Sequence, residues 1–304
     1  AFRPVGLDQD SENYVQYYYG NTEQILEFTF TAISALVSFF ADSPRGMFVV
    51  YALLGILLHT WAVTRSTPFW LLALVVWMGN FYLYQEVTQI RVAVAAGLFL
   101  VGLSYLAKGE KRTYLLFSLA AACFHYSAFV LPLLTFFGSR PLTLRGRLVI
   151  GAIPLLGYLL FFGGFDPIAS LPIPWIQEKL WIYERLRDSG MAGDAINVFN
   201  IVYVMRLLVF YLLLWKYDVI KEQAPNLSLL LKVFAISYFC FTALGALPVM
   251  AFRYAELFGV VEIVMVPYLA LTMKPEAFGK SLVIVFAFGC MMLNVFYNEL
   301  LKLS

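Results

Sequence analysis

The chain has few charged residues, and it is poor in the residue types that bind zinc or form disulfides. Of its 304 residues, 13% are charged, two are histidine and three are cysteine. All three cysteines lie inside apolar runs, which argues against a disulfide framework. The sequence has no cluster of cysteine and histidine, so we expect no metal site. A net charge of +2 is too small to indicate nucleic-acid binding.

Hydrophobic residues, by contrast, make up 62% of the sequence. A soluble domain of this length cannot bury so much apolar surface, because its exterior needs polar coverage. Apolar runs of about 17 to 25 residues, the length that crosses a bilayer, predict an all-α, polytopic integral membrane protein with about ten transmembrane or re-entrant helices. The runs lie near residues 24–41, 46–63, 68–84, 88–106, 112–137, 145–164, 196–217, 227–247, 252–273 and 279–298.

We predict one transmembrane domain over residues 1–304, with a polar segment at 1–23 and a long polar loop at 165–195, because no repeat or linker is visible. Since Lys and Arg collect in cytoplasmic loops, four basic loops place both polar segments outside. The basic loops contain Lys108, Lys111, Arg112, Arg140, Arg145, Arg147, Lys216, Lys221, Lys274 and Lys280. The printed sequence begins with Ala1, and we expect a further helix before it.

One run conflicts with this orientation. Basic loops flank residues 112–137 on both sides, so both ends fall in the cytoplasm although the run is a single one. A bend at CFHYSAF resolves the conflict, because irregular backbone at membrane depth survives beside protein or a watery cavity. The alternative is that one basic loop breaks the rule. The run at 24–41 is either spanning or interfacial.

Three arginines lie in or at the edge of apolar runs: Arg91, Arg206 and Arg253. An arginine near the bilayer centre costs a few kcal/mol on insertion scales, so it usually faces a cavity or a partner. The predicted orientation puts Arg91 and Arg253 at the same external face, where we expect them to line a shared site. The alternatives are snorkelling to the headgroups and, for Arg253, an ion pair with Glu256, three positions further on.

Two other features have both a functional and a structural interpretation. His125, in the sequence FHYSAF, is either an acid or base or a packed side chain bonded to a carbonyl. The loop QEKLWIYERLRDSG mixes aromatic rings with carboxylates and guanidinium groups. It either contacts sugar and phosphate or forms an amphipathic helix at the membrane interface. His59 follows a plain apolar run, and we interpret it as structural.

Five segments, in order along the chain, resemble the EpsG-type polysaccharide polymerases, the Wzy-like enzymes of O-antigen, capsule and exopolysaccharide assembly. They are RPVGLDQDSENY, TQIRVAVAAGLFLVGLSYLAKGEKR, LAAACFHYSAFVLPL, LWIYERL and FRYAELFGVVEIVMVPYL. The sequence departs from the family in two places. Val92 follows Arg91 where the family usually has Gln, and the family's first helix, expected before Arg3, is absent from the printed sequence.

The resemblance implies a GT-C-like glycosyltransferase of polysaccharide biosynthesis in the bacterial cytoplasmic (inner) membrane. Such an enzyme transfers a growing glycan from undecaprenyl diphosphate to the terminal sugar of a lipid-linked repeat unit, at the periplasmic or outer face. Arginines can stabilise the leaving diphosphate in a partly dry cavity, so we expect neither a metal nor a cofactor. The expected partners are the lipid-linked oligosaccharide, membrane lipid and a chain-length regulator protein, but no nucleic acid.

The resemblance also implies roles for particular residues. The candidate base for the acceptor hydroxyl is, in order, His125, Asp8 or Glu184. The diphosphate ligands would be Arg3, Arg91 and Arg253 first, and Arg185, Arg187 and Arg206 second. Four further residues would bind sugar or stabilise the developing charge: Tyr14, Gln89, Tyr183 and Tyr254.

Three other functions remain open at this point. An O-antigen ligase would share the arginine site, although ligases tend to have a longer external loop. A flippase or transporter usually shows internal repeats with interrupted helices. A non-catalytic scaffold would pair each buried arginine with a carboxylate.

Overall fold

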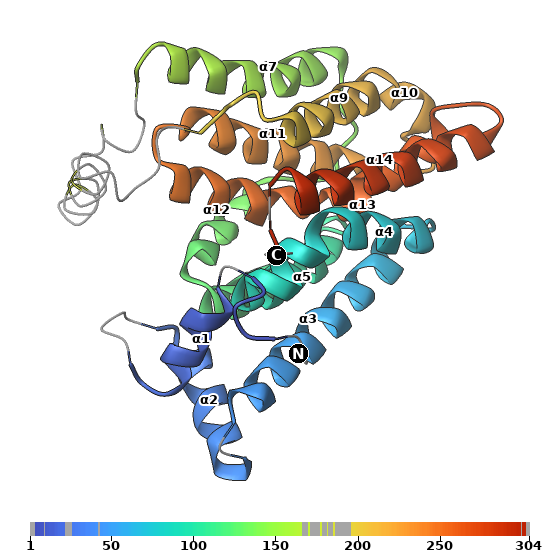
Figure 1. The fold of residues 1–304 in the computed structure, drawn as a ribbon. Helices are drawn as coiled ribbons and strands as arrows, with labels where there is room; N and C mark the ends of the chain where they lie inside the picture. Colours follow the sequence, from blue (N-terminus) through green and yellow to red (C-terminus); the bar gives the residue numbers. More distant parts are fainter. Residues whose placement is uncertain are drawn as a thin grey trace. The chain divides into compact units, whose positions relative to one another are not determined.

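The computed structural model is built from helices (Figure 1). No strand occurs among the described residues, apart from one isolated bridge between Asp8 and Leu301. The structure describes residues 4–8, 10–21, 26–41, 43–165, 170, 177, 181, 185, 196–298 and 300–301.

The chain divides into two compact units. The first unit comprises Ala1–Ser139, Glu222–Asn226 and Glu262–Ser304, and the second comprises Arg140–Lys221 and Leu227–Val261. The first contains α1 (Ser11–Tyr18), α2 (Phe28–Phe40), α3 (Pro44–Ser66), α4 (Trp70–Val76), the π-helix η1 (Trp77–Thr88), α5 (Ile90–Leu106), α6 (Lys111–Phe124), the 3₁₀-helix η2 (Tyr126–Phe136), α13 (Glu262–Met265), η3 (Val266–Leu271) and α14 (Glu276–Phe296). The second contains α7 (Leu144–Phe162), α9 (Ile201–Trp215), α10 (Tyr217–Ile220), α11 (Leu227–Ala243) and α12 (Pro248–Gly259). The single domain over 1–304 stays a prediction.

Several helices are long and apolar enough to cross a bilayer. They are Pro44–Ser66, Leu144–Phe162, Pro248–Leu271 and Glu276–Phe296. Shorter apolar helices accompany them, among them α2, α5, η2, α9 and α11. The chain is therefore an all-α, multi-pass membrane protein, which confirms the fold class predicted from the apolar runs. With 13 residues, α2 is about 20 Å long and reaches across only part of a bilayer core of about 30 Å.

In the first unit, α3 and α5 lie side by side and run in the same direction (Figure 1). Pro44 occupies the first turn of α3, where its missing N–H costs nothing. Early in both helices, Tyr51 shares a buried cluster with Ile90 and Val94. One end of each helix therefore lies beside the N-terminal segment, and the other end lies at Ser66 and Leu106.

The run at 112–137 bends, as predicted. Helix α6 ends at Phe124, His125 is extended (φ −153°, ψ 121°), and η2 begins at the next residue. The hydroxyl of Tyr114 donates to the carbonyl of Leu131 at 2.6 Å, so η2 folds back along α6. Thr29, at the start of α2, donates to the Cys123 carbonyl at 2.6 Å and helps to fix the bend. Such a reversal returns both ends of the run to one side.

The sequence did not predict that α4 continues into the long π-helix η1. π-Helical geometry is rare and is found frequently at functional sites. Gly79 of η1 lies directly against the backbone of Ala287 in α14. A glycine permits this approach because it has no Cβ, a common device where membrane helices pack closely.

We therefore expect Gly79→Ala to destabilise the first unit by about 1–3 kcal/mol, the usual cost of overpacking. A Cβ at this position would meet the Ala287 carbonyl group, which is backbone and cannot rotate away. Thermal unfolding in detergent measures the effect. Gly138→Ala is the matched control, because no heavy atom lies within 4 Å of its added Cβ. Equal melting temperatures for the two variants would contradict this packing.

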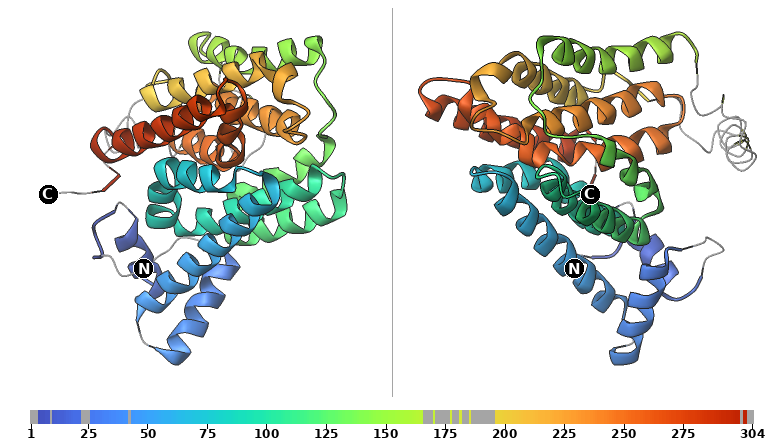
Figure 2. Two further views of the ribbon diagram at one scale, coloured as in Figure 1. Left: turned by 90° about the vertical axis from the view of Figure 1, so that its right-hand side faces the viewer. Right: turned by 180° about the vertical axis from the view of Figure 1, so that it is seen from behind.

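In the second unit, α11 packs against both α7 and α12 (Figure 2). The side chains of Thr143 and Asn200 accept backbone N–H groups at the starts of α7 and α9, as N-caps of a helix do. The hydroxyls of Tyr158 and Tyr238 lie 2.9 Å apart and link α7 to α11.

Candidate functional site

Arg91 lies in the first turn of α5, directly after η1. Its guanidinium carbon is 5.4 Å from the ring centroid of Tyr14, 5.7 Å from that of Tyr17 and 5.6 Å from that of Phe30. Three aromatic rings therefore surround the charge at distances that favour cation–π attraction. The side chain keeps 17% of its surface exposed. Gln89, at the start of α5, instead donates to the Tyr84 hydroxyl at 3.1 Å.

A carboxylate joins Arg91 to His125. Glu27, just before α2, accepts a hydrogen bond from Nη1 of Arg91 through Oε2. Its other oxygen, Oε1, lies 3.2 Å from Nδ1 of His125. Burial raises the pKa of the Glu27 carboxyl, but the nearby His125 imidazole and Arg91 guanidinium outweigh burial and lower that pKa below its ordinary value. Glu27 is therefore ionised at neutral pH.

The bend between α6 and η2 positions His125. Its side chain is 12% exposed, and Nε2 has no hydrogen-bond partner among the described residues. A carboxylate beside one ring nitrogen fixes the orientation of an imidazole. The other nitrogen, Nε2, is buried and could exchange a proton only with a ligand that reaches the bend.

A groove of about 430 Å³ adjoins this cluster. It shares Tyr17 and Phe30 with the ring set around Arg91, and its lining also includes hydroxyl groups of α2. The hydroxyl-bearing residues are Thr31, Ser34 and Ser38. Aromatic faces and hydroxyl groups together suit a sugar, whose apolar face stacks on rings while its hydroxyls form hydrogen bonds.

Two predicted site residues support this region from the N-terminal segment. Asp8 is buried, and its Oδ1 accepts the backbone N–H groups of Asp10 at 3.1 Å and Ser11 at 2.9 Å. It thus holds the start of α1, whose Tyr14 lies in the buried cluster. Burial raises the pKa of the Tyr14 hydroxyl to about 12, so this tyrosine stays protonated. The role of Asp8 as base stays a prediction.

Several predicted residues of the polar segments lie outside the described residues: Arg3, Tyr183, Glu184 and Arg187. Arg185 is described, and its guanidinium carbon lies 3.7 Å from the ring centroid of Trp181. A role of the 165–195 loop in binding sugar or phosphate stays a prediction.

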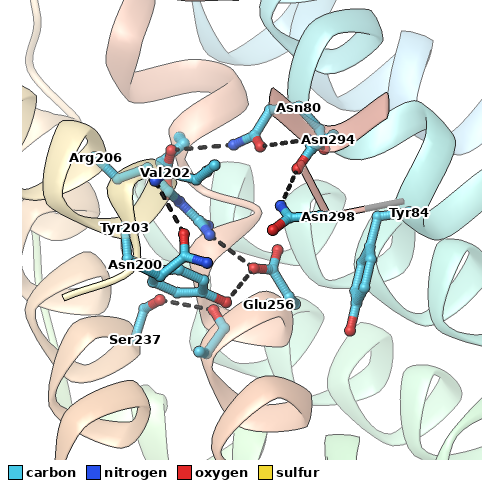
Figure 3. Close-up of polar contacts among 12 residues, drawn as sticks. Asn80, Tyr84, Asn200, Val202, Tyr203, Arg206, Ser237, Glu256, Asn294 and Asn298 are labelled. Atoms are coloured by element: carbon cyan, nitrogen blue, oxygen red, sulfur yellow. Dashed lines mark hydrogen bonds and ion pairs between the residues drawn. The ribbon is translucent and has the colours of Figure 1, made fainter. Parts of the chain in front are cut away.

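The remaining predicted arginines belong to the second unit, and Figure 3 shows one of them, Arg206, beside Glu256. Arg206 of α9 is 2% exposed and donates from Nη1 to Oε1 of Glu256 in α12 at 2.7 Å. The Tyr203 hydroxyl donates to the same oxygen. The alternative that Glu256 pairs with Arg253 is therefore wrong: the helix turns Glu256 inward toward α9, whereas Arg253 is exposed.

Arg253 forms no ion pair with any described residue. Its neighbour Tyr254 is partly buried in the same helix. Both residues keep their predicted roles as ligands of the diphosphate and of sugar. Their convergence with Arg91 on one site likewise stays a prediction. The burial and pairing of Arg206 favour a structural role for that arginine.

Sequence reasoning missed Glu27, Tyr17 and Phe30. The signal for Glu27 was a carboxylate at the entrance to an apolar run. The interpretation of His59 as a structural residue in an apolar run did not include its contacts with other side chains. The Nδ1 atom of His59 lies 3.1 Å from Oε1 of Glu86 in η1. The His59 ring stacks on the Trp77 ring, with the two ring centroids 5.0 Å apart.

A separate row of hydrogen-bonded polar side chains begins at η1 in the first unit (Figure 3). Asn80 donates to Glu262 at 3.4 Å, Asn294 donates to Asn80, and Asn298 donates to Asn294 at 2.9 Å. These contacts tie η1 to α13 and α14, and thus hold the helix that leads into Arg91.

The fold and the buried charges define a multi-pass membrane protein with a polar site at one end of its first unit. A family model described as the EpsG family matches residues 1–303. The chain therefore belongs to the EpsG family, which confirms the resemblance and makes it a polymerase-type membrane protein of polysaccharide biosynthesis. No curated protein and no solved structure matches the chain.

Proposed function

We propose that the chain polymerises lipid-linked repeat units at the outer face of the bacterial cytoplasmic membrane. It transfers the growing glycan from undecaprenyl diphosphate to the terminal sugar of the next repeat unit. The observation that carries the proposal is the cluster of Glu27, Arg91 and His125 beside a groove suited to sugar.

Each member of the cluster has a task in this reaction. The acceptor hydroxyl attacks C1 of the donor sugar and gives its proton to Nε2 of His125. The bond between C1 and the diphosphate oxygen breaks, and its electrons leave with the lipid diphosphate. Arg91 stabilises that developing negative charge, since its Nε has no hydrogen-bond partner among the described residues. Glu27 orients both groups.

The groove holds the acceptor sugar by this account. Tyr17 is partly exposed and offers a ring face next to Arg91, so a sugar stacked on it would lie close to the guanidinium. Arg253 is the second diphosphate ligand in the proposal. Guanidinium charge then supplies the stabilisation that a divalent metal provides in other transferases, so polymerisation is metal-independent.

Purified protein in nanodiscs, incubated with synthetic undecaprenyl-diphosphate repeat units, tests the proposal. We expect a ladder of products that survives EDTA, persists in Arg112→Ala and disappears in Arg91→Ala. Arg112 is a matched control because it is an exposed arginine of the same unit. A single addition to a different acceptor would favour a ligase, and transport of the lipid without elongation would favour a flippase. A ladder lost with EDTA would contradict the metal-independent step.

A further inference from the structure

The first unit has a second pocket, far from the candidate site. Its volume is about 440 Å³, within the range of small-molecule sites. The ends of α3 and α5 form much of its wall, through residues 64–68 and 104–108. From Tyr51, beside the candidate site, to Arg65, α3 rises by about 20 Å. The two sites therefore lie near opposite ends of the same helices.

The charge of this pocket has one sign. Arg65 and Lys108 line it, and no Asp or Glu does so among the described residues. Neither cation forms an ion pair with a described residue. The other polar lining consists of hydroxyl and amide groups, which accept and donate hydrogen bonds without adding charge. They belong to Thr64, Ser66, Thr67, Ser104, Gln223, Asn226 and Tyr268.

The wall of the pocket is held in place by hydrogen bonds. The carbonyl of Ser66, at the end of α3, accepts from the Asn226 amide at 2.8 Å and from the Tyr268 hydroxyl at 3.2 Å. Tyr268 also lies 2.7 Å from Oδ1 of Asn226. The end of α3 carries a partial negative charge. Because Asn226 and Tyr268 already donate to it, this charge does not neutralise the two cations.

Arg65 is partly stabilised by its own surroundings. Its guanidinium carbon lies 5.8 Å from the ring centroid of Trp61 and 5.6 Å from that of Tyr105. Stacking of this kind fixes the plane of a guanidinium and leaves its N–H groups at the edge available. An arginine held in this way is ready to grip the oxygens of an anion.

We propose that this pocket binds a phosphate-bearing ligand at the basic end of α3 and α5. Two unpaired cations, uncharged donors and the absence of a lining carboxylate match a phosphate group on a polar body. The orientation predicted from the basic loops places this end in the cytoplasm. The same chemistry is present in a soluble nucleotide and in an anionic lipid headgroup. The proposal does not depend on the reaction at the other end.

Native mass spectrometry of the full chain in detergent tests the proposal with two pairs of probes. ADP is compared with adenosine, and short-chain phosphatidylglycerol with the corresponding diacylglycerol. We expect the phosphate-bearing member of at least one pair to bind saturably and its partner not to bind. Binding of ADP alone assigns a soluble ligand, binding of phosphatidylglycerol alone assigns a lipid headgroup, and binding of both supports the shared phosphate chemistry.

The double variant Arg65→Gln, Lys108→Gln is expected to bind the phosphate probe at least about tenfold more weakly than the unmodified protein, because charge-assisted hydrogen bonds are lost. The matched control is Lys111→Gln, Arg112→Gln, which removes the same charge from exposed positions outside the pocket. Should the double variant fail to fold, Ala107→Phe fills the pocket and keeps both cations. Equal affinity in the pocket variant and the control, or no preference for phosphate in either pair, overturns the proposal.

Discussion

His125→Ala is expected to lower the rate of polymerisation at saturating repeat unit by about 10²- to 10⁴-fold, the usual contribution of a general base. The substitution removes the nitrogen that would accept the acceptor's proton but leaves the Glu27–Arg91 pair in place. Binding of the lipid-linked donor should change little, because Arg91 remains. The measurement is the initial rate of product formation together with the KM for the repeat unit.

The chain supplies a matched control for this experiment. His59 is the other histidine, and it too is buried beside a carboxylate, but that carboxylate belongs to Glu86 and not to the Glu27 that binds Arg91. His59→Gln should lower the melting temperature while keeping the rate per folded molecule within a few-fold of the unmodified protein. A fully active His125→Ala variant would assign the base to another residue, and Asp8 would be tested next.

The second large effect is on stability. Arg206→Met is expected to destabilise the protein by about 3–5 kcal/mol, the cost of leaving one partner of a buried ion pair uncompensated. Glu256 would keep the Tyr203 hydroxyl but lose the only guanidinium that an ion pair among the described residues gives it. The free energy of unfolding in mixed detergent micelles measures this loss.

Two variants sharpen that result. Arg253→Met makes the same chemical change at an exposed position, so its effect on stability should stay within about 0.5 kcal/mol. Combining Arg206→Met with Glu256→Gln removes both charges and should recover much of the loss, as when a buried pair is replaced by uncharged groups. Equal destabilisation by Arg206→Met and Arg253→Met would show that the Arg206 pair is not structural.

The membrane fold could be predicted from the sequence because its physical cause is local. Apolar runs long enough to cross a bilayer are visible without knowing what they pack against. The bend at His125 could also be predicted, since basic loops on both flanks of one run are incompatible with a single crossing. The π-helix η1 could not, because its backbone geometry depends on close packing such as that of Gly79 against α14.

The candidate site was only partly predictable for a similar reason. Arg91 and His125 stand out as polar residues within apolar runs, so a sequence can indicate each of them. Their common partner Glu27 lies 64 residues before Arg91, and no periodicity links the two. The alternative pairing of Glu256 with Arg253 shows the same limit, because helical spacing favours a neighbour in sequence whereas in the fold Glu256 pairs with Arg206.

A structure of the protein with a bound undecaprenyl-diphosphate repeat unit tests the central claim most directly. The account predicts the diphosphate within hydrogen-bond distance of Arg91, and the acceptor hydroxyl near Nε2 of His125, with the sugar against Tyr17. A repeat unit bound elsewhere, with the Glu27–Arg91–His125 cluster closed and out of contact with it, would contradict the claim.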